Sequence, residues 1–93
     1  MDTQKSKLGK QGDVLAAITD RKVVVGAKQL RKAMNAGNAR QVYLAENADP
    51  ALTQPIEAQC QLNSVKYAWV ATMQDLGRAC GIEVGAAAAA AVD

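Results

Sequence analysis

The chain has 93 residues, enough for one hydrophobic core but not for two. Its 49% hydrophobic and 22% charged residues exclude an intrinsically disordered chain. The formal net charge is only +2, yet residues 21–40 hold six of the eleven Lys and Arg residues and no acid, so positive charge is concentrated in one segment.

The first residues predict an arm followed by a short helix. Residues 1–12 are polar and basic and contain two glycines, so we expect a flexible arm, with a single domain over residues 13–93. The apolar residues of Asp13–Thr19 fall on one helical face, which predicts a first helix.

A strand, a helix and a second strand are predicted next. Lys22–Val25 is rich in β-branched residues and stops at Gly26, which favours a buried strand. Ala27–Ala36 has apolar residues at helical spacing, and Gly37 stands where the C-terminus of a helix favours glycine. Gln41–Ala45 is the second predicted strand.

A further helix is predicted in the middle of the chain. Asp49 is suited to cap it, and Pro50 to occupy its first position. We expect it to extend to about Leu62 and to end with Asn63 in a left-handed conformation. Pro55 has no backbone N–H, so the helix either kinks or restarts there.

The final third predicts two strands around a short helix. Val65–Ala71 is the third strand, and a capping-box pattern begins a helix over Thr72–Cys80 that Gly81 ends. Helix propensity alone favours a helix for Ala86–Val92, but the alternation of strands and helices favours a last strand. This alternation predicts an α/β fold with helices on both faces of a small sheet.

The junction between the first strand and its helix is the leading candidate site. A helix N-terminus offers unpaired N–H groups and the positive end of the helix dipole, which favour anions. The donors around the turn at Gly26 are Lys28, Gln29, Arg31 and Lys32. Glutamine both donates and accepts hydrogen bonds, which suits the edge of a purine base. An ordinary solvated helix face fits the pattern equally well.

The loop Gly81–Gly85 is the second candidate site. Ile82 and Val84 flank Glu83 between two glycines. Either Ile82 folds back on the preceding helix as part of its C-cap, or the loop is an exposed apolar lip that stacks on a flat ligand.

Few other residues suggest chemistry. We interpret Tyr67 and Trp69, which share one strand face, as core rather than as a base-stacking platform. Cys60 and Cys80 are interpreted as small apolar residues, not as a disulfide or zinc site. Without histidine, the common acid–base and nucleophile arrangements are missing, so we expect no enzyme, metal or cofactor. The absence of a long apolar segment or signal core predicts a cytoplasmic protein with no membrane partner.

Three segments are the most distinctive in the chain: Val25–Gln29, Ala48–Pro50 and the twelve residues LGRACGIEVGAA, Leu76–Ala87. Together with the order of strands and helices over about Val14–Val92, they resemble the kink-turn-binding ribosomal-protein family, the L-seven-Ae family. The resemblance is greatest to its small bacterial members.

The resemblance implies a three-layer α-β-α sandwich around a four-stranded mixed sheet. It also implies binding of kink-turn RNA, a duplex bent sharply at a bulge beside tandem sheared G·A pairs. By position, the residues placed at the G·A pairs are Gly26, Lys28, Gln29 and Lys32. Those placed on the bulged nucleotides are Ile82, Glu83 and Val84.

We therefore expect a monomeric, non-enzymatic RNA-binding protein. Its expected partners are structured RNA containing a kink-turn and the ribosome, but not DNA, with Arg31 as a further RNA contact. Two alternatives stay open. The acidic segment Glu46–Glu57 motivates a protein-interaction module on the same scaffold. The helix N-terminus at Gly26 motivates an enzyme acting on a small phosphorylated ligand.

Overall fold

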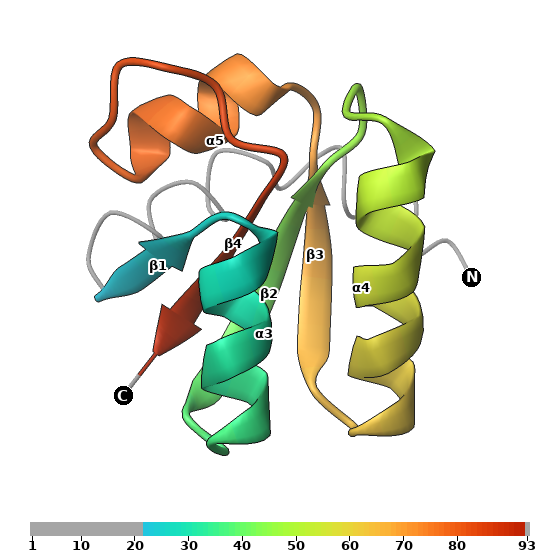
Figure 1. Cartoon of the computed structure of the whole chain (residues 1–93). Coiled ribbons are helices and arrows are strands. Elements are labelled where there is room, and N and C mark those ends of the chain that lie inside the picture. The colour runs from blue at the N-terminus through green and yellow to red at the C-terminus, as the bar shows by residue number, and fades with distance from the viewer. Residues whose placement is uncertain (1–21, 93) are drawn as a thin grey trace.

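The computed structural model describes residues 22–92, which form three helices and one four-stranded sheet (Figure 1). The strands are β1 (Val23–Val25), β2 (Ala39–Ala45), β3 (Lys66–Val70) and β4 (Ala88–Val92). The helices are α3 (Ala27–Asn35), α4 (Pro50–Leu62) and α5 (Met73–Ala79). The arm predicted over residues 1–12 and the helix predicted over residues 13–19 lie outside the described residues.

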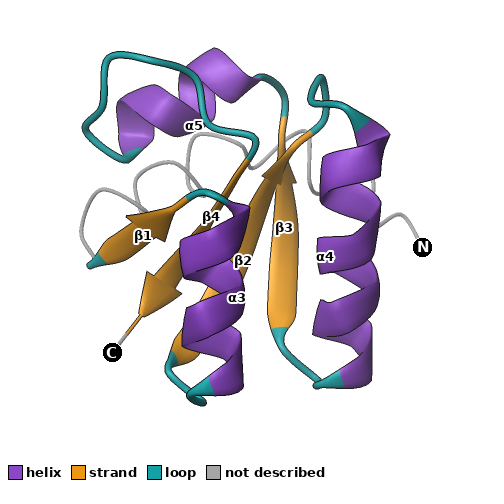
Figure 2. Ribbon diagram, in the orientation of Figure 1, coloured by secondary structure: helices purple, strands orange, loops and turns teal. Residues whose placement is uncertain are grey.

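The sheet is mixed and has the strand order β1-β4-β2-β3 (Figure 2). β4 pairs antiparallel with both β1 and β2, whereas β2 pairs parallel with β3. The last strand of the chain therefore lies between the first two. Ala89, for example, faces Val25 on one side and Tyr43 on the other.

Helices cover both faces of the sheet. Side chains alternate from one face to the other along each strand, and apolar side chains on both faces form a core cluster with a helix. α3 and α4 bury Leu30, Met34, Ile56 and Cys60 against one face. α5 buries Leu76 against the opposite face. Figure 2 shows α3 and α4 side by side in front of the sheet. The predicted α/β fold, a three-layer α-β-α sandwich, is confirmed.

The alanine-rich end of the chain is a strand, as the alternation of elements predicted, and it begins at Ala88 rather than Ala86. The four alanines of β4 are at most 1% exposed. Alanine favours helix locally, but β4 forms ladders with two neighbouring strands, and this tertiary pairing outweighs propensity. The small side chains also let Leu30 and Met34 of α3 pack directly on β4.

Gly37 follows α3 as predicted, and α4 ends at Leu62 as predicted, but the left-handed residue after α4 is one position later than predicted. Gly37 has φ 77°, and its N–H donates to the carbonyl of Met34 (3.1 Å) in a Schellman turn. Asn63, the predicted left-handed residue, has φ −98°, whereas Ser64 has φ 58°. Val65 explains the difference. Its side chain packs against the core and its N–H donates to the carbonyl of the buried Cys60 (2.9 Å), which places the left-handed turn at Ser64.

α4 continues through Pro55 as a single helix, so of the two predicted outcomes a restart does not occur. The predicted cap is confirmed, because the Asp49 carboxylate accepts a hydrogen bond from the N–H of Ala51 (2.9 Å). Pro55 has no N–H to donate to the carbonyl of Ala51, the residue one turn earlier in the helix. Both residues are exposed. Water can solvate that carbonyl, which allows the helix to tolerate the proline.

The aromatic residues of β3 belong to the core side of the sheet, as predicted. Tyr67 and Trp69 pack against the cluster beneath α3 and α4, and the Tyr67 hydroxyl accepts a hydrogen bond from Gln61 (2.9 Å). Across residues 22–92, no helix combines the length and the apolar character needed to cross a membrane.

Candidate nucleic-acid interface

Gly26 joins β1 to α3 in a backbone conformation that favours glycine. Its φ is 96°, and it is the N-cap residue of α3. No side-chain cap bond forms at this helix end within the described residues, and the first turn contains no acid. Among residues 22–92, therefore, neither the N-cap residue nor the first turn supplies a carboxylate or hydroxyl to the first-turn N–H groups and the positive end of the helix dipole. Such a helix end favours an anion.

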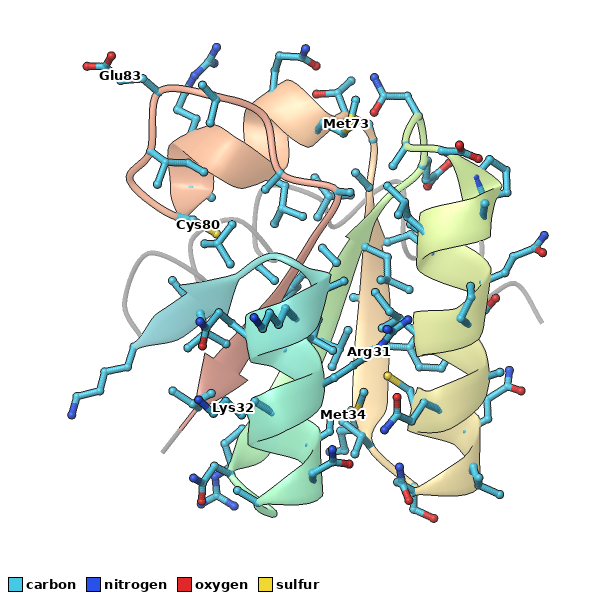
Figure 3. All side chains as sticks on the ribbon, in the orientation of Figure 1. Arg31, Lys32, Met34, Met73, Cys80 and Glu83 are labelled. Carbon is cyan, nitrogen blue, oxygen red and sulfur yellow. The ribbon has the colours of Figure 1, made fainter. Side chains whose placement is uncertain are left out.

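The polar side chains of α3 are spread around its exposed half. Lys28 and Gln29 are exposed in the first turn. Arg31 and Lys32 are also exposed but leave the helix on different sides. Figure 3 shows Arg31 between α3 and α4 and Lys32 on the flank toward β1 and β4. Gln29 and Lys32 line a concavity of about 330 Å³ on that flank, next to Val24. The four predicted donors thus do not meet at a single point.

The loop after α5 is held by the cap of that helix. Gly81 has φ 82°, and its N–H donates to the carbonyl of Arg78 (3.0 Å). The N–H of Ile82 donates to the carbonyl of Gly77 (3.0 Å), which completes a Schellman turn. Beyond the loop, the N–H of Ala86 donates to a carbonyl in the first turn of α5 (3.0 Å). Both ends of the loop are therefore fastened to α5.

Two glycines allow this loop to lie directly on α5. A Cβ on Gly77 would overlap the backbone carbonyl oxygen of Val84, and a Cβ on Gly85 would lie 3.1 Å from the Cβ of Met73. Gly77 is a buried helix residue, a position where glycine costs about 1 kcal/mol relative to alanine. The close approach of the loop backbone accounts for glycine at this position.

Exposure divides the loop into two parts. Ile82 is half-buried and packs against the core cluster that contains Leu76, so it folds back as a C-cap residue does. Val84, in contrast, is 70% exposed. Glu83 is exposed and points outward (Figure 3). Ile82 is therefore the apolar anchor of the loop, as the C-cap interpretation predicted, and Val84 is its exposed tip.

The start of α3 and the loop lie at the same end of the sheet. The N–H of Gly26 donates to the carbonyl of Ala88 (3.0 Å), the residue with which β4 begins after the loop. Figure 1 shows the loop arching over the end of the sheet where α3 starts. Two segments that are far apart in the sequence are thus brought together.

Three residues that the sequence did not single out contribute to this region. The Asn47 side-chain oxygen accepts a hydrogen bond from the N–H of Met73 (2.8 Å) at the start of α5. Nothing local marks this role, since the two residues are 26 positions apart. Gln74 and Arg78 lie one turn apart on α5 and line a concavity with the loop. Their i, i+4 spacing beside the loop was the available signal.

Neither cysteine is suited to nucleophilic chemistry. Both are free, and burial, with a smaller effect of the Glu57 carboxylate, raises the pKa of the Cys60 thiol to about 11. Burial also raises the pKa of Cys80. The reactive thiolate is therefore scarce at neutral pH. Among residues 22–92, no group of acids and cysteines could hold a metal ion. What this end of the molecule offers is charge, hydrogen-bond donors and an apolar tip.

Known proteins resemble this chain in sequence and in architecture. Residues 10–93 match the Ribosomal protein L7Ae/L30e/S12e/Gadd45 family. The chain is 45% identical over 71 residues to an RNA-binding protein of Caldanaerobacter subterraneus subsp. tengcongensis, which covers 76% of this chain and 87% of that protein. It is 41% identical over 69 residues to the RNA-binding protein YbxF of Geobacillus stearothermophilus, covering 74% and 84%.

A solved structure of another RNA-binding protein has a similar fold. The Giardia lamblia 15.5kD RNA binding protein superposes with a TM-score of 0.77 and 26% identity, over 92% of this chain and 72% of that chain. The family match spans the whole described domain, and the small bacterial relatives align along most of their own length. This chain therefore belongs to the Ribosomal protein L7Ae/L30e/S12e/Gadd45 family.

Proposed function

We propose that this chain is a non-enzymatic RNA-binding protein that recognises and stabilises kink-turn motifs in rRNA or structured mRNA. The observation that carries the proposal is that the basic, uncapped start of α3 and the apolar loop lie at one end of the sheet. Its family membership and the bacterial RNA-binding relatives support RNA as the ligand.

The start of α3 is suited to the groove that a kink opens. The major groove of regular A-form RNA is too deep and narrow for side chains, but sheared G·A pairs at a sharp bend make base edges accessible. Lys28 supplies positive charge there, and Gln29 can both donate to and accept from a purine edge. The N–H groups beyond Gly26 add donors for a phosphate or a base edge.

The loop supplies the second half of the interface. Bulged nucleotides leave their stack and expose flat apolar faces, which proteins cover with apolar or aromatic side chains. Val84 is exposed for this contact, and Ile82 behind it fixes its position by packing on the core. Because both ends of the loop are fastened to α5, little order has to be gained on binding.

The protein would act by trapping RNA that is already bent. A ligand that binds one of two conformations more tightly shifts the population toward it. To move an RNA from 1% to 99% kinked, the protein must bind the kinked form roughly 10⁴-fold more tightly, about 5.5 kcal/mol. Contacts made only with the kinked shape, such as those of Gln29 and Val84, are the source of this difference.

A gel-shift comparison tests the proposal directly. A kink-turn duplex is compared with a duplex of the same length in which Watson–Crick pairs replace the G·A pairs, at several salt concentrations. We expect much tighter binding of the kink-turn duplex at each salt concentration. Equal affinity for the two duplexes would show that the protein binds RNA without recognising the kink.

The same proposal covers the protein's partners and setting. The candidate site is formed by one chain, so we propose that the protein acts as a monomer, in the cytoplasm, with the ribosome among its partners and with neither DNA nor a cofactor. Sedimentation of the protein alone measures its oligomeric state, and sedimentation with ribosomes measures whether it binds them. A protein that sediments as a dimer, or that never moves with ribosomes, contradicts the corresponding part.

A protein-interaction module is the second candidate, because α4 exposes large apolar side chains. Leu52 is 50% exposed and Leu62 is 84% exposed, on a helix with no basic residue. Binding to a protein partner that is insensitive to salt, together with no affinity for kink-turn RNA, would favour this function. Substitution of Leu62 by serine would then weaken binding of the protein partner.

A further inference from the structure

A groove of about 590 Å³ lies at the end of the sheet opposite to the candidate interface. This distal groove runs between the turn that joins α3 to β2 and the turn that joins α4 to β3, at the lower end of the molecule in Figure 1. Arg40 and Lys66 line it from the start of β2 and β3, and Asn63 and Ser64 line it from the turn after α4. All four residues are exposed, and no acid of residues 22–92 lines the groove.

The balance of charge in the distal groove is positive. α3 and α4 both end there, and the negative end of each helix dipole amounts to about half an elementary charge. The full positive charges of Arg40 and Lys66 exceed these two partial charges. The acids of the described chain lie in the middle of α4 or toward the other end of the sheet, at Glu46, Asp49, Glu57, Asp75 and Glu83.

The two cations are not required to cap the helices. Backbone N–H groups of the following turns already donate to the last carbonyls, those of Lys32, Ala33 and Met34 in α3 and those of Gln59, Cys60 and Gln61 in α4. Within residues 22–92, the side chains of Asn63, Ser64 and Lys66 make no hydrogen bond or salt bridge. Their donors are therefore available to a ligand.

Ser64 has a backbone conformation that other residues adopt at lower cost. Its φ is 58°, and every other residue with positive φ in residues 22–92 is a glycine. Glycine and asparagine populate this region more readily than serine does. Serine, however, adds a hydroxyl donor to the lining of the groove. Strained positions of this kind concentrate at binding sites.

The lining of the distal groove matches a nucleic-acid backbone. Phosphate groups are bound by Arg and Lys together with Ser and Asn side chains, which are the residue types found here. The volume is that of a site for a nucleotide, not for a single ion. An acidic peptide would also be attracted by the two cations, but the family relatives that bind RNA favour RNA as the ligand.

We propose that the distal groove binds the phosphate backbone of a second RNA segment, outside the kink-turn, so that the protein joins two RNA segments. The inference goes beyond the proposed function and takes from it only RNA as the ligand. β2 extends from the groove to the pair formed by Leu44 and Ala88, next to the start of α3, a span of roughly 20 Å. A short kink-turn duplex bound at the start of α3 therefore leaves the groove open.

The test measures binding of a second RNA to protein that is already saturated with an unlabelled kink-turn duplex. The second RNA is a fluorescently labelled Watson–Crick duplex, and its binding is followed by anisotropy at several salt concentrations. We expect salt-dependent binding with a Kd of about 1–100 µM. Amide NMR of isotope-labelled protein in the same complex should show the largest shifts at residues 37–40 and 63–66.

Three variants locate the contact. Lys66→Gln should weaken binding of the second duplex by about 3- to 10-fold. Lys22→Gln removes the same charge at the same end of the sheet, beside the edge strand β1, and should leave this binding unchanged. Ser64→Gly should weaken it by about 2- to 5-fold while the midpoint of urea unfolding stays the same or rises, because glycine relieves the strain at this position. Weaker binding without lost stability separates a missing contact from impaired folding.

Several results would overturn the distal site. Equal effects of Lys66→Gln and Lys22→Gln, or amide shifts spread over the whole surface, would attribute binding to overall charge. Absence of binding by the second duplex would reject the site outright, and binding of an acidic peptide but not of RNA would assign the groove to a protein partner. None of these results affects the kink-turn preference, which is measured with the first duplex alone. If that preference is absent, the same titration of the free protein still decides whether the groove binds RNA.

Discussion

Gln29 is the residue on which discrimination between RNA shapes depends most. Of the exposed side chains in the first turn of α3, Lys28 only donates hydrogen bonds, whereas Gln29 also accepts them. We expect Gln29→Ala to reduce the difference in binding free energy between a kink-turn duplex and its Watson–Crick counterpart by about 1–3 kcal/mol. Titration of both RNAs under the same salt conditions measures this difference.

A matched substitution in the same helix serves as the control. Asn35 also carries an exposed amide but lies in the last turn of α3. Asn35→Ala should leave discrimination unchanged, and both variants should fold with stabilities within about 0.5 kcal/mol of wild type, as surface substitutions do. Equal discrimination by Gln29→Ala and wild type would mean that Gln29 does not read the G·A pairs.

At the scale of elements, the placement of the loop on α5 depends on Gly77. Helix propensity alone predicts that Gly77→Ala stabilises the protein by about 1 kcal/mol. The added methyl group would instead overlap the carbonyl of Val84 and displace the loop, so we expect a destabilisation of about 1–3 kcal/mol. The displaced loop should also weaken binding of kink-turn RNA. Urea unfolding and RNA titration measure the two effects.

Gly85→Ala should disturb the contact between the loop and α5 less than Gly77→Ala does. Its Cβ would meet the Cβ of Met73 at 3.1 Å, a contact that a small shift can relieve. We therefore expect Gly85→Ala to fall between wild type and Gly77→Ala in both stability and affinity. If Gly77→Ala is as stable as wild type and binds RNA equally well, the seating of the loop on α5 is not required for function.

Sequence patterns identified elements better than the way they come together. The short-range signals of Lys22–Val25 and Asp49–Pro50 predicted a strand and a helix start, both confirmed. Asn63 is not the left-handed residue after α4, because the packing of Val65, a tertiary contact, places the turn at Ser64. The position of β4 between β1 and β2 has no local signal either, since it depends on pairing between distant segments.

The same limit applies to the candidate site. The charge of residues 21–40 marked the start of α3, and the GIEVG pattern marked the loop, because both are local features of the sequence. The divergence of Arg31 and Lys32 depends on how α3 is rotated against the sheet and α4 (Figure 3). The concavity of Arg78 and Glu83 depends on the close approach at Gly77. Neither arrangement can be read from composition or spacing.

For the molecule as a whole, the placement of Arg31 and Lys32 on opposite flanks of α3 predicts how RNA binding responds to salt. A helix end inserted in a groove has a phosphate backbone on each side, so each flank can reach a different strand. We expect Arg31→Ala and Lys32→Ala each to reduce the slope of log affinity against log salt by about one, and the double variant by about two.

Lys66→Ala, at the far end of the sheet, removes the same charge and should leave the slope unchanged. If only one of the two α3 variants changes the slope, α3 lies against a single strand and does not enter the groove. If Lys66→Ala changes it as much as the others, the salt dependence reflects overall charge and not this interface.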